Sequence, residues 1–303
     1  MRILICGATG LIGSALSELC LQQNHKVHYL TTRKDKIQQS DNYSGFYWNP
    51  AKGEIDKTCF EGVDAIVNLS GANIAKRWTE AYKQEIVSSR VDTANIVFKS
   101  LRTIKNHTIT HYISASGIAI YPSSLTEKYT ENAEVESNDF LGKVVKQWEL
   151  HAQQFNSLEI PVTILRTGIV LSEKGGALVE MAKPVKYGVG AAVGSGKQWQ
   201  SWIHIDDMAR MYLHILTKKI TGIYNAVGPN PATNKVLTKE IASVLKKPFF
   251  MPNVPKFMMK MLFGEMSTLL FSSQQVNSQK IENTGFQFYF PDLKPALEDL
   301  LKK

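Results

Sequence analysis

The chain has 303 residues, 44% of them hydrophobic and 20% charged, a balance that excludes a disordered chain, a collagen-like repeat and a disulfide miniprotein and suits an enzyme-sized globular protein. Its 35 lysines and arginines outnumber its 27 aspartates and glutamates, a formal net charge of +8, but they are scattered in pairs such as Lys246-Lys247 and form no long run. We therefore expect a solvated basic surface, with no nucleic acid and no membrane as a partner.

The first predicted unit is a strand, a glycine turn, a helix and a second strand. An apolar run at residues 2–6 leads into GATGLIG at residues 7–13, and a helical pattern and a strand at residues 27–30 follow. In a strand-to-helix turn the first glycine permits the tight turn, the second lets backbone N–H groups approach a pyrophosphate, and the third allows close helix packing. The GxxGxxG spacing in this position predicts a dinucleotide site.

Strands and helices continue to alternate through the first half of the chain. Further strands are predicted at residues 65–69, 111–114 and 162–165, with helical segments around residues 79–103 and 139–155. This alternation predicts an α/β fold with a Rossmann-type doubly wound parallel sheet. We place an NADP-binding Rossmann domain at residues 1–170.

The texture of the sequence changes after Arg166, where glycines and then prolines crowd the chain. We expect residues 171–303 to form mainly a smaller C-terminal substrate-binding lobe, with residues 203–228 returning to the Rossmann domain. The methionine-rich stretch at residues 257–271 either lines an adaptable pocket or touches a membrane or, as we expect, packs as a helix in a core.

The end of the second strand selects the nicotinamide cofactor. An acidic side chain there binds the ribose hydroxyls of NAD, whereas a cationic one binds the 2′-phosphate of NADP. The sequence reads TTRK at residues 31–34, and Arg33 is able to pair bidentately with phosphate oxygens. We therefore expect NADP, with NAD as the weaker alternative; otherwise this segment is only an exposed basic turn.

A set of longer motifs now makes a family resemblance specific. Beside the glycine turn they include NLSGA at 68–72, RW at 77–78, SASG at 114–117, DFL at 139–141, WE at 148–149, GGAL at 175–178, GSGKQW at 194–199, SWIH at 201–204 and NAVGPNP at 225–231. Over nearly its whole length the chain resembles atypical short-chain dehydrogenase/reductases of the NAD-dependent epimerase/dehydratase family, YfcH type, some of which carry the name of a cell-division inhibitor.

The resemblance implies a Rossmann fold that binds NADP and a C-terminal lobe that closes over a small-molecule substrate. Carried over by motif, the cofactor-binding residues are Gly7, Thr9, Gly10, Leu11, Ile12, Arg33, Leu69, Ser70, Gly71, Ala72, Arg166, Thr167 and Gly168. These positions follow the carboxyl ends of predicted parallel strands, where such sheets bind ligands.

The catalytic residues of this superfamily are only partly present. Its chemistry uses a tyrosine acid/base whose pKa is lowered by a lysine four residues on, with a serine beside the reacting oxygen. Ser116 fills the serine position, or else its hydroxyl only satisfies backbone groups. None of the eleven tyrosines is followed by lysine at that spacing. Tyr121 is our first substitute, unless it merely packs beside Pro122; Lys143 and Lys146 are weaker ones.

Aromatic and polar residues after the glycine-rich stretch suggest a substrate pocket. We expect Gln198 and Trp199 to bind substrate. His204 is expected to be hydrogen-bonded scaffold, and Asp206 or Asp207 to cap the following helix.

A second group of polar residues flanks the helix near residues 79–103. Arg77-Trp78 and Ser89-Arg90 lie where an anionic substrate group would approach, or else form surface pairs with Glu80 or Glu85.

The cysteine and histidine patterns narrow the class further. Three cysteines without a CxxC pair indicate neither a disulfide framework nor zinc, and the seven histidines show no HExxH spacing, so we expect no metal. No stretch has the 18 or so apolar residues of a membrane span, and the first apolar run is too short for a signal peptide. We expect a cytoplasmic monomer or homodimer.

Two functions remain open at this point. The first is an NADP-dependent oxidoreductase or epimerase that acts on a small carbonyl, alcohol or sugar-nucleotide-like compound, with Ser116 and Tyr121 at the reacting oxygen. The second is a non-catalytic NADP-binding regulator or sensor, suggested by the missing tyrosine-lysine pair. Whether the protein is an enzyme is therefore left open.

Overall fold

A large β-sheet forms the centre of the computed structural model, which describes residues 1–302. Its strands are β1 (Arg2–Cys6), β2 (Lys26–Thr31), β3 (Tyr43–Asn49), β4 (Glu54–Ile55), β5 (Ala65–Asn68), β6 (His111–Gly117), β8 (Val162–Thr167) and β12 (Gly222–Ala226). They lie in the order β12-β8-β6-β5-β1-β2-β3-β4, and only β4 is antiparallel to its neighbour. The predicted Rossmann-type doubly wound parallel sheet is confirmed.

The remaining strands are short and pair outside this sheet. They are β7 (Lys128–Tyr129), β9 (Ile169–Leu171), β10 (Trp199–Gln200), β11 (Trp202–His204), β13 (Ala232–Thr233) and β14 (Gln275–Val276), which pair as β7 with β14, β9 with β11 and β10 with β13. The helices are α1 (Leu11–Gln22), α2 (Glu80–Leu101), α3 (Phe140–Gln153), α4 (Ala177–Lys186), α5 (Ile205–Lys218), α6 (Asn234–Val244), α7 (Lys256–Phe263), α8 (Thr268–Phe271), α9 (Gln279–Glu282) and α10 (Leu293–Leu301).

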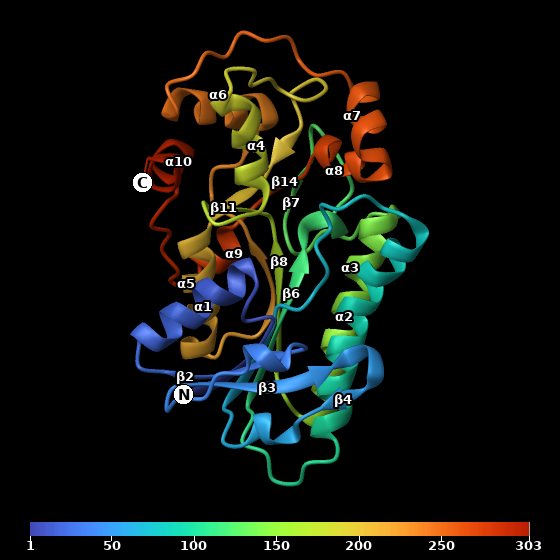
Figure 1. Cartoon of the computed structure of the whole chain (residues 1–303), viewed down its shortest axis with the longest axis vertical. Helices are drawn as coiled ribbons and strands as arrows, with labels where there is room; N and C mark the ends of the chain where they lie inside the picture. Colours follow the sequence, from blue (N-terminus) through green and yellow to red (C-terminus); the bar gives the residue numbers. More distant parts are fainter. Residues whose placement is uncertain (303) are drawn as a thin grey trace.

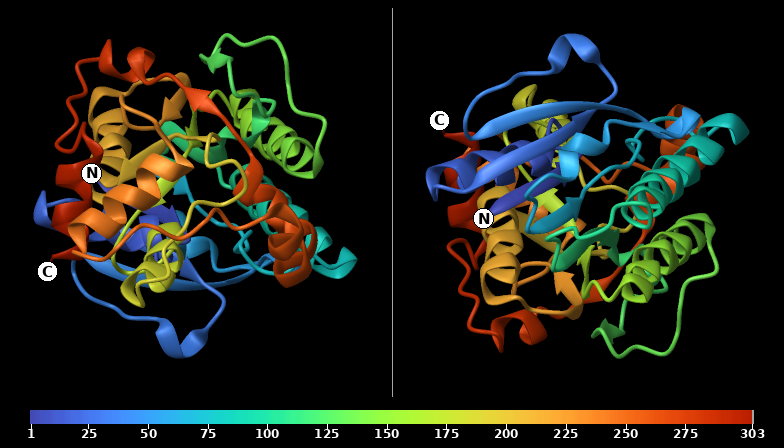
Figure 2. Two further views of the ribbon diagram at one scale, coloured as in Figure 1. Left: turned by 90° about the horizontal axis from the view of Figure 1, so that it is seen from above. Right: turned by 90° about the horizontal axis from the view of Figure 1, so that it is seen from below.

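Helices cover both faces of the central sheet. Figure 1 shows α1 and α5 on one side and the long α2 and α3 on the other, and Figure 2 shows the same layers along the vertical axis. The alternation along β1 produces this sandwich: Ile3 and Ile5 pack into the core under α1 and α5, whereas Leu4 and Cys6 pack into the core under α2. A strand covered on both faces reads as a continuous apolar run, which is why β1 was predictable.

The strand β3 was not predicted. Its sequence YSGFYWN is only partly buried, with Phe46 and Trp48 facing the α2 side. Gly45 has to lack a side chain because a Cβ there would collide with the ring of Tyr29 on β2. A glycine and a serine inside a half-exposed strand weaken the apolar pattern on which strand prediction depends.

The second lobe has a core of its own above the carboxyl ends of the strands. Helices α4, α6 and α10 bury Leu178, Leu237 and Leu297 together with Trp202. The chain also returns to the main sheet, because β12 pairs with β8 in parallel register. The domain limits given above remain predictions.

The prediction for the methionine-rich stretch is wrong in its first half. Helix α7 has no buried residue, and Met258 and Met261 are 44% and 76% exposed, although Met266 just beyond it is buried. Figure 1 shows α7 at the edge of the molecule, near the start of α3. Apolar composition predicts burial only where another element covers the helix, and no described element covers this one on its outer face.

Candidate cofactor and active site

The two central turns meet where the strand order reverses. Strands β1 and β5 are neighbours, and the chain crosses from β1 to β2 on one side and from β5 to β6 on the other. The turns that follow them touch: a Cβ at Gly7, whose φ is +84°, would lie 3.1 Å from the carbonyl of Leu69. A crevice at such a switch point is where open parallel sheets bind ligands.

The glycine turn leaves the start of α1 open to an anion. Gly10 is the N-cap residue and supplies no side-chain cap, so side chains do not satisfy the first N–H groups of the helix. A Cβ at Gly13 would collide with the carbonyl oxygen of Gly7, so close packing of turn and helix requires glycine there. Thr9 and Gly10 are exposed. This bare helix N-terminus fits the pyrophosphate of a dinucleotide.

A free cation lies beyond the end of β2. Arg33 is exposed, its backbone N–H donates to Thr31 Oγ1 at 3.2 Å, and no ion pair involves its guanidinium within residues 1–302. The neighbouring Lys34 lies over the ring of Tyr47 instead, 4.9 Å from its centre. The Arg33 side chain is therefore available to an anionic ligand.

The turn after β5 is held by backbone and side-chain bonds. The Leu69 N–H donates to the carbonyl of Cys6 at 2.9 Å, and the Ser70 N–H donates to Asn68 Oδ1 at 3.1 Å. The Ala72 N–H reaches Ser89 Oγ on α2 at 2.9 Å. The Ser70 hydroxyl itself is buried and has no partner among the described residues.

A polar row crosses the carboxyl ends of three strands. Ser116 on β6 is in register with Arg166 on β8, which is in register with Asn225 on β12. Glu149 from α3 lies against this row: Ser116 Oγ donates to Glu149 Oε1 at 2.6 Å, and Arg166 donates from Nε to Oε1 and from Nη2 to Oε2, both at 2.9 Å. All four residues are buried. Although burial works against its charge, pairing with Glu149 raises the pKa of Arg166.

Tyr121 joins the same network. Its hydroxyl donates to Asn225 Oδ1 at 2.8 Å and accepts from Arg166 Nη1 at 3.0 Å, and the residue is only 1% exposed. Burial raises the pKa of the Tyr121 hydroxyl, against the lowering influence of Arg166. Ser116 and Tyr121 thus belong to one cluster, which we call the Glu149 network (Ser116, Tyr121, Glu149, Arg166, Asn225).

The two weaker lysine candidates are not part of this cluster. Lys143 and Lys146 are exposed, and Lys146 pairs with Glu136 at 2.7 Å on the surface. The side of α3 that faces Tyr121 carries Val145, which packs in the same apolar cluster. Neither lysine candidate therefore lies beside Tyr121. The prediction from sequence also missed Glu149, although its position on the helix α3 was an available signal.

The other residues predicted after β8 have protein neighbours. Thr167 Oγ1 donates to the carbonyl of Leu165 at 3.3 Å. A Cβ at Gly168 would collide with the carbonyl oxygen of Ser201, so this glycine permits the close approach of the segment before β11. Their cofactor contacts remain predictions.

The two predicted substrate residues have different surroundings. Gln198 is 3% exposed, and its Nε2 donates to the carbonyls of Val193 and Leu270 at 3.0 Å each. Trp199 is half-buried, donates from Nε1 to the carbonyl of Leu125 at 3.1 Å, and borders a hollow of about 380 Å³ beside α6 and the start of α10. Gln198 acts as an internal brace here, and Trp199 retains an open face.

His204 is scaffold, as expected, but it also takes the capping role predicted for an aspartate. Its Nδ1 accepts the backbone N–H of Asp206 at 3.1 Å and caps α5, because the helix starts at Ile205 and already includes both aspartates. Its Nε2 lies 3.4 Å from Asp299 Oδ2, so His204, Asp206 and Asp299 form a cluster with metal-ligand chemistry. Since Nδ1 is an acceptor, Nε2 carries the proton in the neutral ring and faces Asp299 as a donor, which argues against a metal ion.

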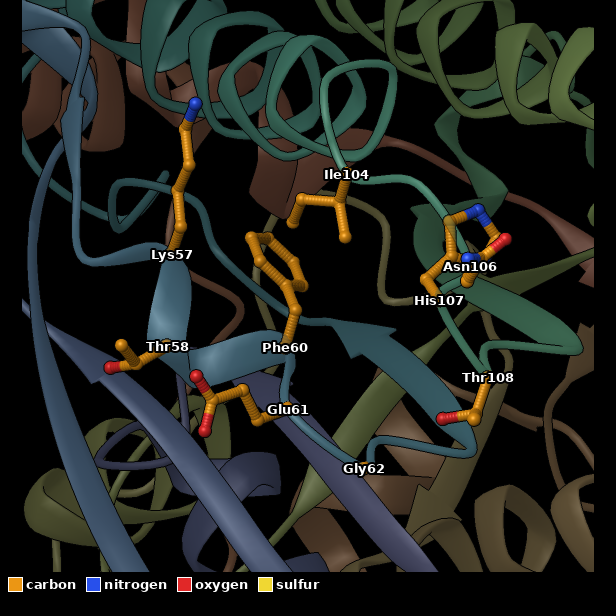
Figure 3. Close-up of a pocket in the computed structure, with 9 residues that line it drawn as sticks. All are labelled: Lys57, Thr58, Phe60, Glu61, Gly62, Ile104, Asn106, His107 and Thr108. Carbon is orange, nitrogen blue, oxygen red and sulfur yellow. The ribbon is translucent and has the colours of Figure 1, made fainter.

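A separate hollow lies at the other end of the central strands, away from their carboxyl ends. It has a volume of about 440 Å³, and Figure 3 shows Lys57, Phe60, Glu61, Ile104 and His107 among its lining residues. Its lining residues come directly before β5 and β6 in the chain, so the hollow lies at the amino ends of these strands. No predicted site residue borders it.

Comparison with known proteins identifies relatives along the whole chain. The model of the NAD dependent epimerase/dehydratase family matches residues 3–228, and that of a domain of unknown function, DUF1731, matches residues 254–300. An epimerase family protein of Staphylococcus aureus is 37% identical over 304 residues, which cover 100% of this chain and 99% of that protein.

Solved structures agree with this match. The human epimerase family protein SDR39U1, solved with NADPH, has a TM-score of 0.86 and 29% identity, with 100% of both chains covered. The UDP-glucuronic acid 4-epimerase of Bacillus cereus, solved with UDP-glucuronic acid and NAD, has a TM-score of 0.78 at 17% identity over 99% of this chain and 98% of that one, and shows the fold alone. Within residues 1–302 we find no helix with the length and apolarity to cross a bilayer.

Proposed function

The chain belongs to the NAD dependent epimerase/dehydratase family, and on this premise we propose that it binds NADP(H) and catalyses an oxidoreductase or epimerase reaction on a small carbonyl, alcohol or sugar-nucleotide-like compound. The observation that carries the proposal is the switch point between β1 and β5, where the glycine turn that leads into the bare N-terminus of α1 packs against the Leu69–Ala72 turn.

The preference for NADP over NAD is the first part of the proposal. Arg33 is an exposed cation without an ion pair in the described chain, and it follows the strand whose end contacts the adenosine ribose in this fold. A guanidinium favours a phosphate over a pair of hydroxyls. The human relative was solved with NADPH, whereas the Bacillus cereus epimerase, which shares only the fold, was solved with NAD.

The second part of the proposal concerns the reacting oxygen. When bound, the cofactor supplies or accepts a hydride at the nicotinamide C4. We assign the oxygen chemistry to Ser116, assisted by Tyr121. Because the Ser116 hydroxyl donates to Glu149 at 2.6 Å, the lone pairs of its Oγ are left to accept a hydrogen bond from a substrate hydroxyl. This favours an alcohol as the group that Ser116 receives.

A second function has its own support. The hydroxyls of Ser116 and Tyr121 are buried and already hydrogen-bonded, and burial raises the pKa of Tyr121, the opposite of what an acid/base at neutral pH requires. These observations favour a non-catalytic NADP-binding regulator or sensor, in which occupancy of the cofactor site alters a surface used by a partner.

Cofactor choice is tested with Arg33→Ala, and Lys34→Ala serves as the matched control because that lysine is already engaged with Tyr47. Calorimetric titration should show NADPH affinity falling about 10- to 100-fold in Arg33→Ala, the loss expected for one charged hydrogen bond, with NADH affinity almost unchanged. Equal losses for both cofactors would refute the 2′-phosphate assignment. Absence of any binding to the wild type would refute the whole proposal.

Catalysis is tested by incubating the protein with NADPH, or with NADP⁺, and a panel of carbonyl and alcohol compounds. Turnover that is lost in Ser116→Ala and Tyr121→Phe while NADPH affinity is kept supports the enzyme. If the wild type consumes no compound but NADPH still raises its melting temperature, the regulator is the correct function.

A further inference from the structure

A second buried arginine packs against the Leu69–Ala72 turn. Arg90, in the middle of α2, is 9% exposed. Its Nη1 donates to the carbonyl of Ile86 at 2.8 Å, and its Nη2 donates to the carbonyl of Ala72 at 3.3 Å. No carboxylate lies within ion-pair distance of it in the part of the chain that the structure describes. Arg90 is therefore a buried cation without a counter-charge.

Its surroundings do not remove the charge. Burial lowers the pKa of Arg90 to about 10, which leaves it a cation at neutral pH. The ring of Trp148 on α3 lies 4.8 Å from the guanidinium carbon and stabilises the cation only partly. A guanidinium has five N–H donors, and only two carbonyl bonds are formed here. Unused donors on a buried charge are costly unless an acceptor completes the site.

Two neutral donors beside Arg90 are also incomplete. The indole Nε1 of Trp148 and the hydroxyl of Ser70 are buried and have no hydrogen-bond partner within residues 1–302. Trp148 contacts Arg90 directly, and Ser70 precedes Gly71, where an added Cβ would lie 2.9 Å from the Arg90 guanidinium carbon. Unsatisfied buried polar groups are rare in folded proteins. Two of them near a buried cation that itself has unused donors indicate a missing acceptor.

We propose that Arg90, with Ser70 and Trp148 as neutral donors, anchors an anion subsite that binds a carboxylate or phosphate group of the substrate. This inference rests on the proposed function, because it assigns the cofactor's own anionic groups elsewhere: the pyrophosphate to the N-terminus of α1 and the 2′-phosphate to Arg33. Carboxylates and phosphates match the planar fork of a guanidinium. The substrate class is thereby narrowed to acidic carbonyl or alcohol compounds.

The alternative is a purely structural clamp, in which Arg90 only ties the turn to α2 through the Ala72 carbonyl. The variant Arg90→Gln separates the two roles, because a glutamine amide still donates to carbonyls but carries no charge. The matched control is Arg102→Gln, at the end of the same helix, where the guanidinium lies over Phe98 at 5.9 Å and no site is proposed.

The experiment titrates wild type, Arg90→Gln and Arg102→Gln with inorganic phosphate, glycerol 3-phosphate and lactate at constant ionic strength, with and without NADPH, by calorimetry and by thermal shift. We expect at least one of the three anions to bind the wild type and Arg102→Gln, and its affinity to fall at least 10-fold in Arg90→Gln, with NADPH affinity unchanged within twofold. Phosphate and lactate distinguish the two anion types.

Three results would overturn the inference. The first is equal binding of these anions by all three proteins, and the second is no binding by any of them. The third is a loss of NADPH affinity in Arg90→Gln of the same size as in Arg33→Ala, which would give Arg90 to the cofactor. Failure of the proposed function looks different, because the wild type would then bind no NADPH while the titrations without cofactor still report on Arg90.

Discussion

Two buried arginines, Arg166 and Arg90, lie on the same side of the central sheet with opposite surroundings. Arg166 is held by both oxygens of Glu149 and by the Tyr121 hydroxyl, so the chain itself completes its charge. Arg90 has two backbone carbonyls, an indole face and no carboxylate within residues 1–302. Burial of a charge costs the same kind of free energy in both places, but only one of them is compensated internally.

The contrast separates a structural role from a binding role. A buried ion pair that is complete within the chain resists rearrangement and positions the elements that share it, here α3, β6, β8 and β12. A buried cation without a counter-charge lowers the stability of the free protein, and a bound anion supplies the counter-charge. On this basis the pair Glu149–Arg166 supports the site, and Arg90 serves recognition.

The largest expected effect comes from breaking the complete pair. Glu149→Ala leaves Arg166 buried without a partner and removes the acceptor of Ser116, so we expect a loss of about 3 to 5 kcal/mol in the free energy of unfolding. Urea denaturation measures it. The double variant Glu149→Leu with Arg166→Met removes both charges and should regain most of the loss. A double variant as unstable as Glu149→Ala would show that shape rather than charge is responsible.

A third buried group, His111, avoids the free-energy cost of a buried charge because it stays neutral. Its Nε2 bonds Thr163 Oγ1 at 2.8 Å, and burial lowers its pKa from 6.5 to about 4. Between pH 6.5 and pH 4 His111 therefore binds a proton in the unfolded chain but stays neutral in the folded chain. The stability that His111 contributes is fully present above pH 6.5 and is lost as the pH falls toward 4.

The His111→Gln variant isolates this contribution. Between pH 7 and pH 4.5 we expect the wild type to lose about 1 to 2 kcal/mol more than the variant, after allowance for partial solvent screening. Urea midpoints at the two pH values measure the difference. Parallel losses in the two proteins would assign the acid sensitivity to other groups.

Removing the incomplete cation should cost little. Arg90→Met abolishes two carbonyl bonds and a ring contact but also removes the uncompensated charge, so we expect stability to change by only about 1 kcal/mol in either direction. The comparison is Arg166→Met, which strands Glu149 and should cost several times more. If the two arginine variants lose equal stability, the distinction between the two sites is wrong.

The smallest effect is expected at an exposed pair. Glu136→Ala breaks the surface contact with Lys146, whose side chain is 69% exposed, and should cost about 0.5 kcal/mol or less because water screens the interaction. Melting curves at low and high salt measure it. A loss comparable with that of Glu149→Ala would contradict the view that burial decides the energy of these pairs.

Prediction from sequence succeeded where a local pattern carries the information. The strands β1 and β5 are apolar because both faces of the sheet are covered. The spacing of the glycines at residues 7, 10 and 13 is enough to predict a turn. The half-exposed strand β3 was not predicted. The helix α7 was predicted to pack in a core, but none of its residues is buried. The residues of β3 lack the apolar pattern of a strand, and those of α7 have the apolar pattern but no element that covers them.

The candidate site divides in the same way. The sequence by itself determined the parallel sheet, the glycine turn and the cationic end of β2, since each depends on residues within one short segment. Only the tertiary structure decided that Glu149 pairs with Arg166 and that Arg90 has no carboxylate partner within residues 1–302, because such partners come from elements far apart in the chain. Burial and counter-charge are properties of the packed molecule, and they decide which of two arginines is scaffold and which is left for a ligand.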